Sequence, residues 1–241
     1  DPAQATLAIA HAAEEAGATL FCHQQVTAIG LSNGRVTHVD TAGLRVDTPM
    51  VVNAAGPWAP SVAQLAGVYL PIYPSRLGSI RTAPLAHQSS VFVQTYAYDF
   101  GGAQAPDGTM RLGSGANRHD VNRFTYNRHF DRATEMRISD KAARIFPALA
   151  NATLIGGWAG IRECTPDMMP ILGPAGGVEG LLVCAGFSGH GFCLGPCAGE
   201  LMAEWIVDGQ PSLDLGAFAW QRFMRPEGPL SVTTIIHEQA G

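Results

Sequence analysis

The chain has 241 residues, of which 46% are hydrophobic and 15% are charged, and its formal net charge is −5. This length and composition suffice for the core of one large or two small domains, and they exclude a basic nucleic-acid-binding surface and an acidic tail. Five scattered cysteines without a Cys-x-x-Cys pair favour reduced thiols over a disulfide framework or an iron–sulfur centre. No signal peptide or apolar run of about 18 residues is seen, so we expect a cytoplasmic protein.

The first segment predicts a helix followed by an antiparallel hairpin. Pro2 suits the first helical position and Gly17 the position after the last turn. The dipeptide Asn33-Gly34 between two strand-like runs is typical of a tight turn with positive φ. The strands predicted here cover residues 19–22, 26–31, 35–41 and 50–54, and a short helix ends near Gly67.

The middle of the chain has a different pattern. Strands predicted over residues 72–82, 91–98 and 109–115 follow one another without crossover helices. A helix over residues 131–146 then ends before Pro147, and a strand-like run over residues 153–162 follows. This order favours an antiparallel sheet.

Residues 181–209 carry the clearest functional pattern. A short apolar strand over residues 181–184 leads into a loop with glycines at positions 186, 189 and 191, and a helix with apolar residues at helical spacing follows. Free N–H groups at a helix start, and a macrodipole equivalent to about half a positive charge, favour an electron-rich ligand. The loop is not GxGxxG and no Gly-Lys-Ser/Thr follows, so a nucleotide-phosphate loop fits poorly. The pattern indicates a flat, partly anionic ligand.

Two strings in this half of the chain resemble a known family. GIRECTPDMMPILG (residues 160–173) and GFSGHGF (residues 186–192) are similar to the C-terminal half of FAD-dependent amine oxidoreductases such as glycine oxidase, sarcosine oxidase and D-amino-acid oxidase. The resemblance extends from Asp1 to about Trp220. It is nearest to the β-type subunits of heteromeric sarcosine oxidase, hydroxyproline dehydrogenase and hydrogen cyanide synthase.

The resemblance implies an α/β (α+β) fold. Residues 1–70 and 151–241 would form the C-terminal part of a Rossmann-like FAD-binding domain, and residues 71–150 an inserted antiparallel-sheet substrate-binding domain. The N-terminal GxGxxG half that such enzymes use to bind FAD is absent from these 241 residues. We therefore expect this chain alone to be incomplete, and we expect another chain or segment to supply that half.

The resemblance also implies an activity. A small amino acid or N-substituted amino acid would be oxidised to an imine by hydride transfer to N5 of noncovalently bound FAD. Iron–sulfur or other electron-transfer subunits are further expected partners, and neither nucleic acid nor a metal ion is expected. Two other functions stay open: a flavin-free assembly subunit, and a related FAD enzyme acting on a non-amino-acid substrate such as a glycerol phosphate.

Site residues follow from the same resemblance. In similar proteins the glycine loop lies against the pyrimidine side of the isoalloxazine, one strand lies beside the adenine, and the segment VVNAAGPWA crosses near the pyrophosphate and ribose. The predicted cofactor-binding residues are Val26, Ala55, Gly56, Trp58, Gly160, Gly186, Phe187, Ser188, Gly189, His190, Gly191 and Phe192. The predicted catalytic residues are Arg162, His190 and Tyr98.

These roles have structural alternatives. The guanidinium of Arg162 matches a substrate carboxylate, but an ion pair with Glu163 or Asp167 would also account for this residue. His190 can hydrogen-bond the flavin or only the backbone of its own loop. Core packing or a turn would explain several of the others, namely Val26, Gly56 and Tyr98.

Three departures from the family's pattern refine the expectation. Cys193 stands where monomeric sarcosine oxidase has a lysine that helps hold the substrate carboxylate, so carboxylate binding falls on an arginine. Gly160 stands where that enzyme attaches FAD through a cysteine, and Cys164 is out of register, which predicts noncovalent FAD. Lys141 is the only lysine and lies on a predicted surface helix, which favours a dehydrogenase over an oxidase.

Overall fold

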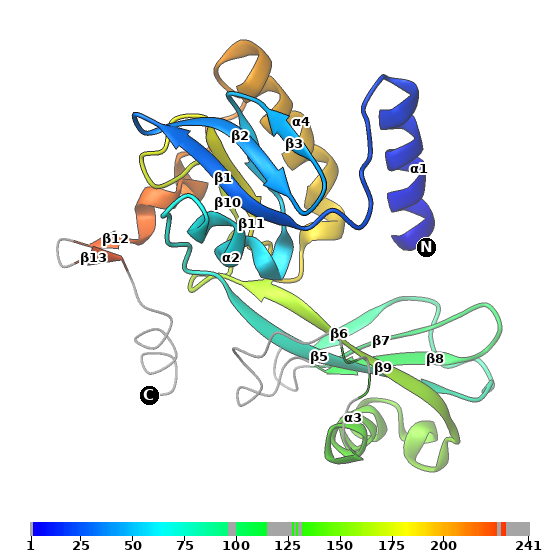
Figure 1. Ribbon diagram of the computed structural model, residues 1–241. Helices are drawn as coiled ribbons and strands as arrows, with labels where there is room; N and C mark the ends of the chain where they lie inside the picture. The colour runs from blue at the N-terminus through cyan, green and yellow to red at the C-terminus, as the bar shows by residue number, and fades with distance from the viewer. Residues whose placement is uncertain are drawn as a thin grey trace. The chain divides into compact units, whose positions relative to one another are not determined.

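The chain divides into two units. The computed structural model describes residues 2–95, 100–114, 127, 129, 132–225 and 228–229. One unit comprises Asp1–Ile72 and Cys164–Gly241, and Tyr73–Glu163 form the other, which is thus inserted in the sequence of the first (Figure 1). Within the described ranges, no helix is long and apolar enough to cross a bilayer.

The first unit opens with the predicted helix and hairpin. Helix α1 (Pro2–Glu15) precedes Gly17, which has a φ of 98°. Strands β1 (Val26–Ser32) and β2 (Arg35–Thr41) pair antiparallel around Asn33 and Gly34, whose φ values of 50° and 77° confirm the tight turn. A third strand, β3 (Arg45–Asp47), was not predicted and adds to the far edge of β2.

One predicted strand is wrong. Residues 19–22 form no strand, although they include two large apolar side chains. Leu20 and Phe21 are exposed, and His23 turns the chain with a φ of 58° before any neighbouring strand is reached. An apolar run does not form a strand without a neighbouring strand, because its backbone N–H and C=O groups then have no hydrogen-bond partners in a sheet.

The second sheet of this unit joins segments from both ends of the chain. Its order is β10-β11-β4, where β10 is Ile171–Pro174, β11 is Leu181–Ala185 and β4 is Val51–Asn53. β10 pairs antiparallel with β11, whereas β4 pairs parallel with it. Strand β11 was predicted, and β4 lies within the predicted run of residues 50–54.

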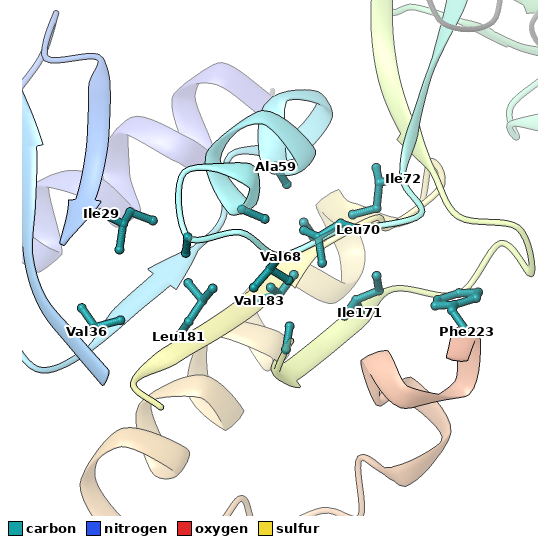
Figure 2. Close-up of a cluster of buried hydrophobic side chains, with 14 residues drawn as sticks. Ile29, Val36, Ala59, Val68, Leu70, Ile72, Ile171, Leu181, Val183 and Phe223 are labelled. Atoms are coloured by element: carbon teal, nitrogen blue, oxygen red, sulfur yellow. The ribbon is translucent and has the colours of Figure 1, made fainter. Parts of the chain in front are cut away.

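The two faces of this sheet bury different layers because side chains alternate along a strand. Leu181 and Val183 of β11 join a core cluster with Ala59 and Ala63 of helix α2 (Ala59–Gln64), which follows the 3₁₀ turn η1 (Gly56–Trp58) (Figure 2). On the other face, Cys184 packs against a cluster that includes apolar residues of helix α4 (Gly191–Asp208). Helices α2 and α4 therefore lie on opposite faces of β11. Helix α4 confirms the helix that was predicted after the loop with glycines at positions 186, 189 and 191.

The chain after α4 returns to the first core cluster. Two 3₁₀ turns, η3 (Gly216–Phe218) and η4 (Trp220–Phe223), precede the short strands β12 (Met224–Arg225) and β13 (Gly228–Pro229). Phe223 is a buried member of the first cluster (Figure 2), and the indole N–H of Trp220 donates to the Tyr69 carbonyl at 2.9 Å.

The second unit is built on a five-stranded sheet of order β6-β7-β8-β5-β9. Its strands are β5 (Tyr73–Thr82), β6 (Val93–Thr95), β7 (Phe100–Gln104), β8 (Met110–Ser114) and β9 (Leu154–Cys164). The pairs β5–β8, β7–β8 and β6–β7 are antiparallel, which confirms the predicted antiparallel sheet, although strand β7 itself was not predicted. Helix α3 (Arg132–Ile145), followed by the turn η2 (Pro147–Asn151), buries Ile138 and Ala142 against Ile80, Met110 and Leu112 of the sheet. The predicted mixture of helix and sheet is thus confirmed.

Gly186, directly after β11, yields a test of local packing. It has a φ of 80°, and an added Cβ would lie 2.6 Å from Thr165 Cγ2 and 3.3 Å from Ile72 Cδ1. We expect Gly186→Ala to lower the free energy of unfolding in urea by about 1–3 kcal/mol, because both the backbone and the packing oppose a side chain. Gly199→Ala is the control: that site is open and helical, so alanine should stabilise by about 0.5–1 kcal/mol. Equal stability of Gly186→Ala and the parent chain would contradict this packing.

Candidate functional site

The candidate site begins at one edge of the β10-β11-β4 sheet. β4 and β11 run parallel, with Val51 opposite Leu181 and Asn53 opposite Val183. Their carboxyl ends therefore lie at the same edge, and the segments that follow them, residues 54–58 and the glycine loop (residues 186–190), leave the sheet there. Ligands of α/β proteins bind at this edge of parallel strands. The parallel pair thus brings together two groups of predicted cofactor residues.

Residues 54–58 are held by a buried asparagine. The side-chain amide of Asn53 donates to the Ala59 carbonyl at 2.8 Å, and its oxygen accepts the Ala55 N–H at 3.2 Å. Gly56 then takes a φ of 54°, and the Trp58 N–H closes the turn on the Ala55 carbonyl at 3.0 Å. Because Asn53 is only 2% exposed, its hydrogen bonds are shielded from water and hold this turn in place.

The glycine loop has an inner and an outer part. Ser188 is 1% exposed and has a φ of 54°, and its hydroxyl donates to the Gly186 carbonyl at 3.1 Å and accepts the Thr165 N–H at 3.2 Å. Gly189 and His190 are exposed, as is Phe192 in the first turn of α4. The outer part offers backbone and ring surface to a ligand, whereas the Ser188 hydroxyl is used within the protein.

The start of α4 suits an anionic ligand. His190 occupies the N-cap position without a side-chain cap hydrogen bond, and the first turn of the helix contains no acidic residue. The first N–H groups of a helix have no intrahelical acceptor, so they and the helix dipole favour negative charge in front of them. This terminus can stabilise charge that develops on a flat ring.

His190 makes the contact that its structural alternative predicts. Its Nδ1 lies 3.3 Å from the Phe187 carbonyl, and its backbone N–H donates to the same oxygen at 2.9 Å. The residue is nevertheless exposed, and this contact engages only one of the two ring nitrogens. A role of His190 toward a cofactor stays a prediction.

A tight turn over residues 165–169, called here the TPD turn, packs directly against the glycine loop. Thr165 is fully buried and joins the two, because its N–H donates to Ser188 and its hydroxyl donates to the Met169 carbonyl at 2.7 Å. The Met169 N–H in turn donates to Asp167 Oδ1 at 3.1 Å, and Met168 takes a φ of 63°. The TPD turn is thus hydrogen-bonded both internally and to the loop.

Arg222, which we did not single out in the sequence, clamps this turn. Its Nε and Nη2 approach Asp167 Oδ2 and Oδ1 at 2.7 and 3.3 Å, and Nη2 also donates to the Met169 carbonyl at 2.7 Å. The guanidinium lies 4.1 Å from the centroid of the Phe223 ring. Asp167, one of the two carboxylates considered as ion-pair partners of Arg162, is therefore paired with Arg222. No local pattern marks this contact, which spans 55 residues.

The other predicted site residues are dispersed. Arg162 and Gly160 lie on β9 in the second unit; Gly160 borders open space, and the Arg162 Nε is buried without a hydrogen-bond partner among the described residues. Val26 begins β1 and, like Ala55, packs against the first core cluster. Tyr98 lies outside the described residues.

The cysteines and acidic residues do not form a metal centre in the described ranges, where no group of three or more potential ligands is found. Cys22, Cys193 and Cys197 are exposed, whereas Cys164 is buried. Burial also raises the pKa of the Cys184 thiol to about 11, so this thiol is protonated at neutral pH.

The Asp167–Arg222 pair predicts a dependence of stability on pH. Partial burial raises the pKa of the Asp167 carboxyl, but the hydrogen bonds from Arg222 and Met169 and the charge of Arg222 outweigh it, so the pKa lies below its ordinary value of 3.8. A lowered pKa stabilises the folded state above the ordinary value, and this contribution is lost as pH falls through the folded-state pKa. We expect Asp167→Asn to cost about 1–2 kcal/mol at pH 7 and progressively less below about pH 4, as measured by urea unfolding between pH 7 and pH 3. Asp140→Asn, on the exposed side of α3, is the control; a cost for Asp167→Asn that does not change with pH would contradict the pairing.

Comparison with known proteins agrees with this geometry. A family model described as FAD dependent oxidoreductase (DAO) matches residues 1–205. Glycine oxidase of Geobacillus kaustophilus is 30% identical over 224 residues, which cover 92% of this chain and 57% of that protein. The hydrogen cyanide synthase subunit HcnC of Pseudomonas protegens is 30% identical over 230 residues, covering 92% and 52%. The crystal structure of L-proline dehydrogenase from P. horikoshii has a TM-score of 0.84 at 30% identity, covering 92% of this chain and 60% of that one.

These matches establish the family, and they confirm the predicted relationship and fold. The chain spans between about half and three fifths of the length of the relatives named here. Because the family model covers most of the chain, and the structural match extends over both units, the chain belongs to the DAO family of FAD-dependent oxidoreductases.

Proposed function

We propose that the protein containing this chain oxidises a small amino acid or N-substituted amino acid with FAD. The observation that carries the proposal is the uncapped, exposed N-terminus of α4 at the carboxyl edge of the parallel β4–β11 pair. The names of the relatives agree with such substrates: they include a glycine oxidase, an L-proline dehydrogenase and human sarcosine dehydrogenase. Each of these named compounds is an amino acid.

The residues at this edge fit the isoalloxazine of FAD. Bound FAD would supply the oxidation chemistry by accepting hydride at N5, with an imine as product. The N–H groups of Gly191 and Phe192 belong to the first turn of α4, which contains no acidic residue, and this suits the negative charge of a reduced ring. Gly189 and His190 would lie at its edge, and residues 55–58 would approach the remainder of the cofactor. Cys164 is buried and Gly160 has no side chain to link, which supports noncovalent binding.

Several surfaces of the first unit suit a further dinucleotide-binding segment. Leu7 and Ile9 of α1 are each 60% exposed, and α1 buries no side chain. Phe192 on α4 is 63% exposed. Among the described strands, none pairs with the outer edge of β4. Such exposed apolar surface and an open parallel edge favour a covering partner, which we propose to be the GxGxxG half, in a longer chain or in another subunit. HcnC and sarcosine oxidase subunit beta, by name subunits of larger enzymes, support a heteromeric assembly.

Arg162 is the proposed partner of the substrate carboxylate. The Nε atom is buried without a partner in the described part of the chain, and neither Glu163 nor Asp167 forms an ion pair with Arg162 there. A buried unpaired donor carries a free-energy penalty that an added acceptor removes. A carboxylate is the acceptor that matches a guanidinium fork best. Amino-acid substrates supply such a group.

The proposed activity is tested on the full-length protein or complex that contains this chain. We expect it to purify with a flavin absorption band, and we expect small amino acids such as glycine, proline or sarcosine to bleach that band under anaerobic conditions. A glycerol phosphate serves as the negative control. A flavin that no amino acid bleaches, or the absence of any flavin, would contradict the proposal.

Substitution of Arg162 tests its assigned role. We expect Arg162→Ala to raise KM for the amino acid that bleaches the flavin by tens- to thousands-fold, equivalent to about 2–5 kcal/mol, because the substrate carboxylate loses its charged partner. Arg144→Ala, an exposed arginine of α3, is the matched control and should leave KM unchanged. Steady-state kinetics of both variants provide the measurement, and an unchanged KM for Arg162→Ala would remove the assignment.

A further inference from the structure

Arg222 is distant from the glycine loop in the sequence, but a series of hydrogen bonds connects the Arg222 side chain to that loop. We propose that Arg222 and Asp167 are positioning residues that hold the glycine loop and the N-terminus of α4 in the shape required for the cofactor. This inference rests on the proposed function, because it concerns the same edge of the sheet. It adds two residues whose proposed role is to position the loop and not to bind the cofactor.

The guanidinium of Arg222 is placed as an anchor. It makes a two-point contact with Asp167, and Nη1 donates to the carbonyls of Phe218 and Ala219 at 2.7 and 3.1 Å. Its side chain is only 15% exposed, and the next residue, Phe223, is buried in the core. A charged group with so many partners in a protected place has little freedom to move. The anchor therefore fixes the TPD turn to the chain that follows α4.

Thr165 passes this restraint to the glycine loop. At one end of the TPD turn, the Met169 carbonyl accepts hydrogen bonds from both Arg222 and the Thr165 hydroxyl. At the other end, the Thr165 N–H donates to the Ser188 hydroxyl, which donates to Gly186. The contacts form an unbroken series from Arg222 to the residue two positions before the N-cap of α4.

Two strained residues lie in this series. Met168 and Ser188 have φ values of 63° and 54°, a region that non-glycine residues adopt rarely and only when the surroundings impose it. Met168 lies in the TPD turn, to which Arg222 and Thr165 form hydrogen bonds, and Ser188 lies in the glycine loop, to which Thr165 forms a hydrogen bond. If the anchor is removed, these residues are free to relax toward ordinary backbone angles, and such relaxation would change the direction in which His190 and the first N–H groups of α4 point.

The test uses the full-length protein or complex that contains this chain, with two readouts. The first is amide hydrogen exchange of residues 186–193, and the second is the dissociation constant of FAD. We expect Arg222→Gln and Asp167→Asn each to speed exchange in this segment and to weaken FAD binding, both by about tenfold, because the loop loses its anchor. Exchange in α3, which belongs to the other unit, should stay unchanged, and this distinguishes loop positioning from global destabilisation.

Matched variants decide the outcome. Arg35→Gln removes an ion pair of 2.8 Å with Glu179 in the same unit, but both side chains are about two-thirds exposed, so neither readout should change. Should Arg222→Gln fail to fold, Thr165→Val is the milder test: it removes the hydroxyl and should speed loop exchange, whereas Thr165→Ser should not.

Two results would overturn the inference. The first is that folded Arg222→Gln has a loop exchange rate and an FAD affinity within about twofold of those of the parent protein. The second is that loop exchange is equally fast in Thr165→Val, Thr165→Ser and the parent protein. If the parent protein binds no FAD, the proposed function fails instead, and the exchange data alone then judge the role of Arg222.

Discussion

The parallel pairing of β4 with β11 is the constraint on which the candidate site depends. It joins residues 51–53 to residues 181–183, and the connection between them contains the whole second unit. Only this pairing places the turn after Asn53 and the glycine loop at the same sheet edge. Two parallel strands are not joined by a hairpin loop, so the segment that follows each strand can carry functional residues. The buried residues Asn53 and Thr165 form hydrogen bonds to these two segments and fix their backbones.

Local sequence patterns predicted the elements whose stability is mainly local or whose partner is next in the chain. The Asn33-Gly34 turn specifies the β1–β2 hairpin, and helical spacing with Pro147 after it specifies α3 to within a residue or two. The errors have physical causes. Residues 19–22 have strand-like composition but no partner, whereas Phe100–Gln104 form β7 despite two adjacent glycines, because β6 and β8 pair with both of its edges. Strand formation is decided by partners that composition does not reveal.

The residues of the candidate site likewise divide into those that local sequence patterns predict and those that such patterns do not reveal. Glycine spacing identified the loop and the helix start, because positive φ and an open helix terminus are local properties. The Arg222–Asp167 clamp could not be found by that reasoning, since nothing near Arg222 distinguishes it from a surface arginine. The sequence left Asp167 as a candidate partner of Arg162, and tertiary structure pairs it with Arg222 instead. Likewise, Ser188 was predicted to contact the cofactor, yet its hydroxyl is engaged by Thr165 and Gly186.

Within the proposed function, the two units carry different tasks. The glycine loop, the TPD turn and Arg222 all belong to the first unit, where their contacts can hold one cofactor in one geometry. Arg162 is on β9 of the second unit, which contains none of the residues that make those contacts. Relatives named for glycine, proline and sarcosine would then share the same cofactor-binding machinery and differ on the sheet. Functional sites of this kind change by substitution around a fixed scaffold, so substrate preference should follow the residues of the β9 sheet, whereas flavin binding should follow Arg222 and the glycine loop.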